Sequence, residues 1–319
     1  MSEAVALNEA HGEGWSFYNA DCVEFARQLP DNSIDFSVYS PPFSSLYIYS
    51  ESAFDMGNVA NDREFMERYR FMVREKLRLT RPGRLTAIHV KDLVYYQNSS
   101  ERGDSGLRPF SDMCSQVHIE EGWTFHCRVT IRRCPVRERE KTNAHGLLYK
   151  TFKKDSTFCR VGMPEYLMVF RKWAYTDEEK ALVRPVPHDA DMQPVEVWRD
   201  LASPVWNVPN DDSFVLGDYD LPSTDVLNFK AAADPEAEKH LCPMPLNITR
   251  RALELWSGSG DVVLSPFGGI GSEGVCSVGM GRKFIGTELH PVYWQQGARN
   301  LEFAKPDAMN GFDFMKDTE

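Results

Sequence analysis

A glycine-rich turn near the C-terminal end constrains the fold of this chain more than any other feature. The apolar residues 262–264 predict a buried strand, the segment 265–271 (Ser-Pro-Phe-Gly-Gly-Ile-Gly) follows directly, and helical spacing resumes over 272–278. Glycines at such a turn let the main chain bend tightly and let a ligand approach main-chain N–H groups. The pattern predicts a strand, turn and helix of an α/β fold with a ligand at the turn.

An acidic residue follows this unit at the spacing expected of a nucleotide-binding fold. Gly269, Gly271 and Gly274 satisfy the pattern G-x-G-x-x-G, and Glu288 ends the next predicted strand 19 residues after Gly269. A carboxylate at this spacing accepts hydrogen bonds from the ribose of a nucleotide cofactor. On these residues alone an NAD-dependent or flavin-dependent dehydrogenase is an open alternative, although Phe267 before the glycines is atypical of an NAD site.

Strands and helices alternate along most of the chain, which implies a largely parallel sheet. Strands are predicted over residues 17–19, 34–39, 85–90, 124–131, 165–170, 262–264 and 284–288, and helices over 22–29, 62–79, 110–120, 247–256 and 272–278. Residues 174–235 interrupt this alternation, because they are rich in Pro, Asp and Ser and carry only isolated apolar clusters.

A second motif ends the predicted strand 34–39. The strand stops at Ser40-Pro41-Pro42-Phe43, because two prolines cannot continue a central ladder of hydrogen bonds. Ser40 is thus expected at the C-terminal end of a strand. Without the glycine-rich turn at the other end of the chain, this tetrapeptide would be interpreted as an ordinary proline turn.

Together the two motifs resemble those of the circularly permuted, beta-group DNA amino-methyltransferases. In that family [DNS]-P-P-[YFW] is catalytic and D-P-F-x-G-x-G binds S-adenosylmethionine; residues 40–43 satisfy the first, and residues 265–271 match the second with serine in place of the leading aspartate. The resemblance covers roughly residues 17–303. It implies an α/β, Rossmann-like methyltransferase fold, with a mixed sheet, helices on both faces, a circularly permuted motif order and an irregular target-recognition insertion.

The resemblance also implies which residues act. The Ser40 hydroxyl and the Pro41 carbonyl would accept the two hydrogens of an exocyclic amino group, which localises its lone pair for direct methyl transfer. Phe43 would stack on a base flipped out of the duplex. The catalytic residues are therefore predicted to be Ser40, Pro41, Pro42 and Phe43, and the residues that bind S-adenosylmethionine Asp21, His240, Pro243, Phe267, Gly268, Gly269, Gly271 and Glu288.

The distribution of charge points to double-stranded DNA as the partner. A net charge of −11 opposes binding to phosphates, yet residues 128–160 hold ten basic and three acidic residues, a local net charge of +7. The predicted DNA-binding residues are Arg132, Arg133, Arg137, Arg139, Lys141, Asn143, His145, Lys150, Lys153 and Lys154. Among these, Asn143, His145 and Lys150 are the candidates for contacts to base edges.

The remaining expectations concern organisation and surroundings. The predicted boundaries are a flexible leader over 1–14, one catalytic domain over 15–305 and a tail over 306–319; the domain comprises a catalytic half 15–173, with the basic segment 128–160, an irregular recognition region 174–238 and a cofactor-binding half 239–305. Seven cysteines without a C-x-x-C pair predict no metal site, and no apolar run has the length of a membrane span. We expect a cytoplasmic homodimer.

The target base has two interpretations. Serine at position 40 favours N4 of cytosine within the family, whereas the extended segment 40–58 resembles phage-borne or orphan enzymes that modify N6 of adenine. We favour adenine, with cytosine as the alternative. The other candidates are a methyltransferase acting on RNA or on protein glutamine, an NAD-dependent dehydrogenase, and a non-catalytic DNA-binding module.

Overall fold

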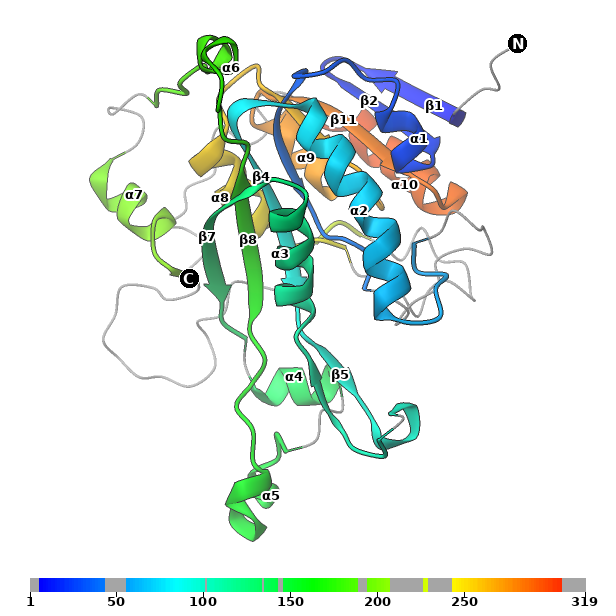
Figure 1. The fold of residues 1–319 in the computed structure, drawn as a ribbon, viewed down its shortest axis with the longest axis vertical. Helices are drawn as coiled ribbons and strands as arrows, with labels where there is room; N and C mark the ends of the chain where they lie inside the picture. Colours follow the sequence, from blue (N-terminus) through cyan, green and yellow to red (C-terminus); the bar gives the residue numbers. More distant parts are fainter. Residues whose placement is uncertain are drawn as a thin grey trace.

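The computed structural model describes residues 6–43, 56–100, 102–133, 135–142, 146–188, 194–206, 226–228 and 243–305. In this part of the chain a nine-stranded mixed sheet forms the centre of the molecule, in the order β1-β2-β11-β10-β3-β4-β8-β7-β9, and β5 and β6 form a separate hairpin (Figure 1). The strands are β1 Ala6–Gly12, β2 Trp15–Ala20, β3 Ile34–Tyr39, β4 Thr80–Lys91, β5 Leu93–Tyr95, β6 Gly106–Arg108, β7 Thr124–Ile131, β8 Glu165–Arg171, β9 Val205–Trp206, β10 Val262–Ser265 and β11 Lys283–Glu288.

Helices cover both faces of the sheet. They are α1 Cys22–Ala26, α2 Asp62–Leu79, α3 Phe110–Glu120, α4 Pro135–Thr142, α5 Tyr149–Lys154, α6 Asp177–Leu182, α7 Val195–Leu201, α8 Leu246–Trp256, α9 Ser272–Gly279 and α10 Pro291–Glu302, with two short 3₁₀ helices, η2 Gln97–Ser99 and η3 Ser156–Phe158. Because side chains alternate along a strand, Ile88 and Val90 pack under α1, α2 and α3 while Leu85 and Ala87 pack under α8 and α9. The expected α/β fold with a mixed sheet is confirmed.

The order of the strands reverses between β3 and β10. From β3 the chain passes through α2 to β4 on one side, and from β10 it passes through α9 to β11 on the other. The two strands are parallel neighbours, with Phe36 opposite Val263 and Ser37 opposite Leu264. Crevices at such a reversal, beyond the carboxyl ends of the strands, are where α/β sheets bind ligands. Both sequence motifs begin at this edge.

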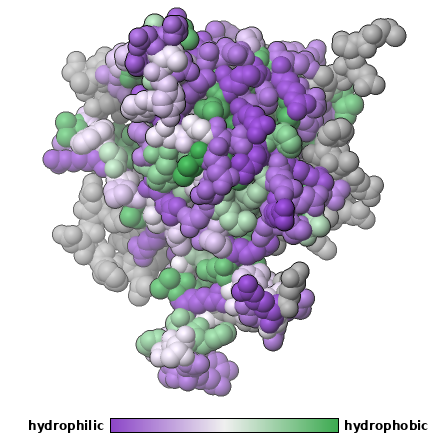
Figure 2. Space-filling view, in the orientation of Figure 1, coloured by the Kyte–Doolittle hydropathy of each residue, from purple (hydrophilic) through white to green (hydrophobic). Residues whose placement is uncertain are grey.

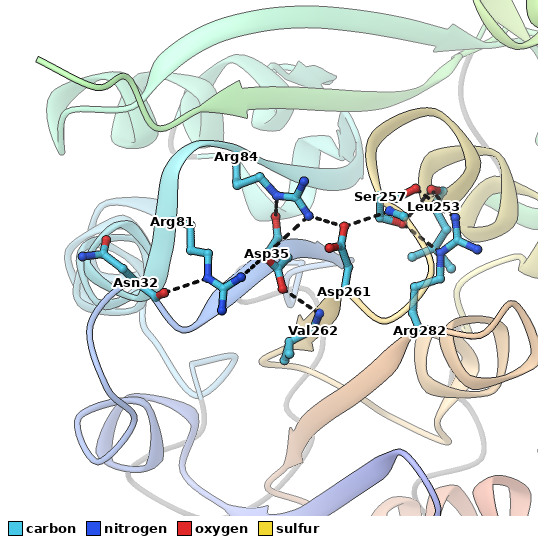
Figure 3. Close-up of polar contacts among 10 residues, drawn as sticks. Asn32, Asp35, Arg81, Arg84, Leu253, Ser257, Asp261, Val262 and Arg282 are labelled. Carbon is cyan, nitrogen blue, oxygen red and sulfur yellow. Dashed lines mark hydrogen bonds and ion pairs between the residues drawn. The ribbon is translucent and has the colours of Figure 1, made fainter. Parts of the chain in front are cut away.

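A network of charged groups holds the same strands together at their amino-terminal ends (Figure 3). Asp35 of β3 accepts hydrogen bonds from Arg81 Nη1 at 2.7 Å and from the main-chain N–H of Val262 at 2.9 Å. Arg84 of β4 donates to the main-chain oxygen of Asp35 and forms an ion pair with Asp261. Asp35 is buried, so these contacts join β3, β4 and β10 where water is scarce.

The N-terminal segment departs from expectation. A flexible leader was predicted over residues 1–14, yet β1 occupies Ala6–Gly12 and pairs with β2 in antiparallel register. Most of its side chains are exposed. An edge strand that buries little leaves no apolar periodicity in the sequence, and its stability comes from main-chain hydrogen bonds to β2.

Two projections extend beyond the carboxyl ends of β3 and β10, where both motifs lie, at the lower end of Figure 1. One is the β5–β6 hairpin, which the sequence did not indicate. The other connects β7 to β8 and contains α4 and α5; we call residues 132–164 the arm. In the described part of the region 174–238, only the short elements α6, α7 and β9 occur. None of the described helices combines the length and the apolar character needed to cross a membrane.

Candidate active site

One pocket at the edge where the strand order reverses joins the two sequence motifs. From the N-terminal half it is lined by Ala20, Asp21, Cys22, Ser40, Pro41, Pro42, Phe43 and Met56, and from the C-terminal half by Pro243, Met244, Pro266, Phe267, Gly268, Gly269, Ile270, Ser272, Glu273, Glu288, Leu289, His290 and Tyr293. Ten of the predicted catalytic and cofactor-binding residues therefore share one cavity. Gly271 lies beside it, as the N-cap of α9, and His240 lies outside the described residues.

Ser40 is held by the strand next to it. Its hydroxyl donates a hydrogen bond to the main-chain oxygen of His89, at 2.9 Å, near the end of β4. Because the proton is engaged there, the lone pairs of Oγ remain available to accept hydrogen bonds from a ligand. Pro41 is buried and the ring of Phe43 lies 6.3 Å from that of Phe110, so the turn is packed against the core.

The glycine-rich turn is closed by main-chain hydrogen bonds. The N–H of Gly268 donates to Thr287 O and the N–H of Gly271 donates to Gly268 O, both at 2.7 Å. Gly269 and Gly271 have φ values of +51° and +86°, a conformation that residues other than glycine rarely adopt. A Cβ on Gly269 would meet no atom within 4 Å, so its main chain faces open space. This is room for a ligand to approach the backbone.

Gly268 has a different requirement from Gly269. A Cβ at this position would lie 2.6 Å from the Phe17 ring and 3.2 Å from Thr287 O, and Phe17 is completely buried. We expect Gly268→Ala to lower the free energy of unfolding by about 1–3 kcal/mol, as overpacked cores do. Urea unfolding measures this change, and Ser259→Ala on the exposed turn before β10 is the control; an unchanged midpoint for Gly268→Ala would contradict the tight packing.

Glu288 connects the two sides of the pocket. Its Oε2 accepts a hydrogen bond from the N–H of Gly269 and its Oε1 accepts one from the N–H of His290, both at 2.8 Å. Asn19 of β2 donates to the main-chain oxygens of Glu288 and Leu289, each at 2.9 Å. The carboxylate is thus fixed by two main-chain N–H groups, and Asn19 fixes the main chain of Glu288 and Leu289.

Asp21 lies at the rim on the N-terminal side. It is the N-cap of α1, and its Oδ1 accepts hydrogen bonds from the N–H groups of Val23 at 3.0 Å and Glu24 at 2.9 Å. Burial raises the pKa of Asp21, and the two N–H donors oppose that rise. One oxygen is used as a helix cap, so the other is available to a ligand.

Glu273 is a pocket residue that sequence reasoning missed. It lies in the first turn of α9, is buried and lines the cavity that also contains Glu288. Burial, together with the charge of Glu288, raises the pKa of Glu273 to about 8. The sequence offered one signal, an acidic residue directly after the glycines where a helix packs on the sheet, but nothing in it marks the residue as buried.

The raised pKa of Glu273 has a consequence for stability. The folded protein holds a proton on Glu273 that the unfolded chain releases near pH 4.5, so folding loses stability as pH rises from 4.5 to about 8. The slope from this residue approaches about 1.4 kcal/mol per pH unit in that window. We expect Glu273→Gln to remove this contribution, measured as urea unfolding free energies at pH 6 and pH 8.5. Equal pH dependence in both proteins would count against it.

A buried polar network lies beneath the pocket. Tyr39, which precedes Ser40, shares a 2.7 Å hydrogen bond with Tyr69 and accepts another from Lys76 Nζ at 2.5 Å. Lys76 is fully buried and also contacts His118 Nε2 at 3.0 Å, and burial lowers its pKa well below the usual value. The Tyr39 ring lies 5.6 Å from that of Phe267. The network therefore supports both motifs from within the core.

The predicted DNA-binding residues divide by position on the arm. Lys150, Lys153 and Lys154 are exposed on α5, and Arg132 is exposed where the arm begins. Arg139 of α4 is half-buried. Asn143 and His145 lie outside the described residues, as do the side chains of Arg137 and Lys141.

Arg133 differs from the exposed residues of the predicted DNA-binding set, because its side chain is paired within the protein. Its side chain is only 7% exposed and donates to Glu165 Oε2 at 2.6 Å, and His89 Nε2 lies 2.9 Å from the same oxygen. Burial alone would raise the pKa of Glu165, but hydrogen bonds and charge from His89 and Arg133 outweigh it and hold that pKa far below its usual range. Arg133 therefore stabilises the base of the arm, a role that a count of charges cannot distinguish from phosphate binding.

Comparisons with known proteins agree with this geometry. A family model described as DNA methylase, of the N6 and N4 type, matches residues 34–299. The chain is 38% identical over 69 residues to the DNA adenine methyltransferase YhdJ of Escherichia coli (strain K12), a match that covers 22% of this chain and about a quarter, 24%, of that relative.

Two solved structures share the fold over nearly their full lengths. TTHA0409 of Thermus thermophilus, solved with S-adenosyl-L-methionine, is 19% identical with a TM-score of 0.62, and the alignment covers 90% of this chain and 94% of that one. The cytosine-N4-specific PvuII DNA methyltransferase is 15% identical with a TM-score of 0.61, covering 92% and 89%. At these identities the likeness concerns the fold.

Proposed function

The chain belongs to the DNA methylase family of N6-adenine and N4-cytosine methyltransferases, and on that premise we propose that it transfers a methyl group from S-adenosylmethionine to N6 of adenine at specific sites in double-stranded DNA. One observation carries the proposal. Ser40, at the end of β3, and the glycine-rich turn, at the end of β10, face the same pocket although they stand at opposite ends of the chain. The donor and the acceptor of a methyl group need such a shared space.

The residues of the C-terminal half of the pocket fit S-adenosylmethionine. Open space at the main chain of Gly269 admits a ligand, and the fixed carboxylate of Glu288 can accept hydrogen bonds from ribose hydroxyls. Asp21 offers an acceptor to the adenine amino group, and Phe267 and Pro243 offer apolar surface. When bound, the cofactor supplies an electrophilic methyl group on its sulfonium. Two carboxylates also suit a ligand that carries positive charge.

The residues of the N-terminal half fit an exocyclic amine. Such a nitrogen is a weak nucleophile because its lone pair is delocalised into the base. Ser40 Oγ donates its own proton to His89 O and so presents lone pairs to one hydrogen of the amine, while the Pro41 carbonyl can accept the other. Prolines fix the direction of that carbonyl before the substrate arrives. Phe43 lines the pocket and offers a stacking face to a flipped base.

Adenine is our choice of base, with N4 of cytosine as the second candidate. The choice of adenine is supported by the local likeness to an adenine methyltransferase, and cytosine is supported by serine at position 40. Modification-aware sequencing of DNA from an expressing host identifies both the modified base and its sequence context. N4-methylcytosine at a defined site would decide for the alternative.

Transfer itself is tested with purified protein. Incubation with unmethylated genomic DNA and tritiated S-adenosylmethionine should label the DNA, whereas labelling of RNA or protein alone, or no labelling at all, would contradict the proposal. Isothermal titration against S-adenosylmethionine and NAD separates the dehydrogenase alternative, which requires preferential binding of NAD.

We further propose a cytoplasmic homodimer, since a two-fold assembly suits palindromic sites; light scattering of the purified chain tests the dimer.

A further inference from the structure

The outer part of the arm is folded without a core of its own. Arg160 N donates to Gly146 O at 3.0 Å and closes the two limbs of the arm, and beyond this point residues 147–159 form α5 and η3. In these two described helices no side chain is buried. Figure 1 shows α5 as the outermost element at this end of the molecule. We call residues 147–159 the tip.

The tip exposes aromatic rings together with lysines. Tyr149 is 74% exposed and Phe152 is 56% exposed, and their rings are stacked with centroids 6.1 Å apart. Lys150, Lys153 and Lys154 on the same short helix are also exposed. Figure 2 shows apolar and polar surface side by side on this projection. Exposed aromatic rings that lie side by side are typical of surfaces that a partner covers.

The base of the arm is fixed beside the catalytic serine. The arm starts next to Arg133 and ends next to Glu165, and these two side chains form an ion pair. His89 contacts the same carboxylate, while its main-chain oxygen accepts the hydrogen bond from Ser40. Lys91, at the end of β4, pairs with Glu138 of α4 at 2.7 Å. The base of the arm is therefore linked to Ser40 through His89, which contacts both Glu165 and the serine hydroxyl.

The chemistry of the tip fits DNA that is locally unstacked. Phosphate binding by lysines needs no aromatic ring, whereas proteins that hold unpaired bases combine cations with rings on which bases stack. Flipping a base creates unpaired and unstacked neighbours. We propose that the tip enters the duplex beside the flipped base, with its lysines on phosphates and with Tyr149 and Phe152 stacked on the bases left exposed there. The inference rests on the proposed function.

Two sets of substitutions separate the two contributions. One protein carries Tyr149→Ala and Phe152→Ala, the other Lys150→Ala, Lys153→Ala and Lys154→Ala, and Phe303→Ala, which removes an exposed ring on the far end of α10, is the control. The duplex contains 2-aminopurine in place of the target base identified by sequencing, so that its fluorescence increases when this base is flipped out of the stack. Thermal unfolding and affinity for S-adenosylmethionine are expected to stay unchanged in all three.

The aromatic variant should lose at least about ten-fold in kcat/KM for DNA and lose most of the 2-aminopurine fluorescence increase, while the salt dependence of DNA binding stays as in the parent. The lysine variant should lower the slope of log Kd against log salt by about 0.9 for each lysine that contacts a phosphate.

Three results would overturn the inference. They are parental fluorescence and kcat/KM in the aromatic variant, an equal loss in Phe303→Ala, and a change of mass in light scattering, which would assign the rings to a second copy of the chain. Each is distinguishable from failure of the proposed function, since in that case the unaltered protein transfers no methyl group. If no target base can be mapped, the tip is tested by whether its two variants lose affinity for a mixed-sequence duplex.

Discussion

Ser40→Ala is expected to lower kcat for methyl transfer about 100-fold to 1,000-fold and to leave the Kd for S-adenosylmethionine within about two-fold. Preorganised hydrogen-bonding groups that act on the reacting atoms contribute on this scale. Ser40 lies at the end of β3 with its proton committed to His89, so its loss removes an aimed acceptor from the amine. The glycine-rich turn, which lies on the neighbouring strand, keeps its own main-chain contacts.

Single-turnover transfer of tritiated methyl groups measures this effect, with isothermal titration for cofactor affinity. Ser40→Asn is the matched variant, since an amide oxygen restores an acceptor and is expected to recover part of the rate. If alanine and asparagine at position 40 retained the parental rate, Ser40 would not contact the amine. A loss of cofactor affinity as large as the loss of rate would instead place it in cofactor binding.

Glu288→Ala is expected to weaken S-adenosylmethionine about 100-fold, with a much smaller effect on kcat at saturating cofactor. Hydrogen bonds to a charged group contribute about 1.5–3 kcal/mol each, and every factor of ten in Kd corresponds to about 1.4 kcal/mol. The carboxylate also holds Gly269 and His290 in place, so its removal loosens the turn that a ligand would meet.

Titration calorimetry gives this Kd, and Glu302→Ala, which removes an exposed carboxylate from the end of α10, controls for the change in net charge. Glu288→Gln keeps the shape but has only one acceptor oxygen, so an intermediate affinity is expected. A kcat that falls as far as the affinity in Glu288→Ala would contradict a role confined to the cofactor.

Local patterns in the sequence were sufficient for the elements that carry the pocket. Alternation and helical spacing predicted β3, α2 and α3 with their observed bounds, because each has strong periodicity and a defined stop. The positions of Ser40 and of the glycine-rich turn at strand ends followed from residues that cannot continue a ladder. That the ends of β3 and β10 lie side by side depends on the strand order. The family resemblance implies this order, and the spacing of residues does not.

Other features depend on contacts between distant residues and leave no local pattern. Lys76 looks like an ordinary surface lysine on α2, yet it is buried because Tyr39 and His118 provide its contacts. Arg133 looks like a free cation until Glu165 is brought beside it. Neither pairing is visible in one dimension, since each joins residues from different elements.

The pairing of β2 with β11 has a consequence for synthesis of the protein. Residues 15–19 lie against residues 284–288, so β2 leaves the ribosome long before its partner β11. Contacts between such distant segments form late. A nascent chain that has completed β3 and β4 therefore presents Ser40 on a strand whose other edge is still unpaired, because β10 has not yet been made. Assembly of the pocket is delayed until β10 and β11 have emerged.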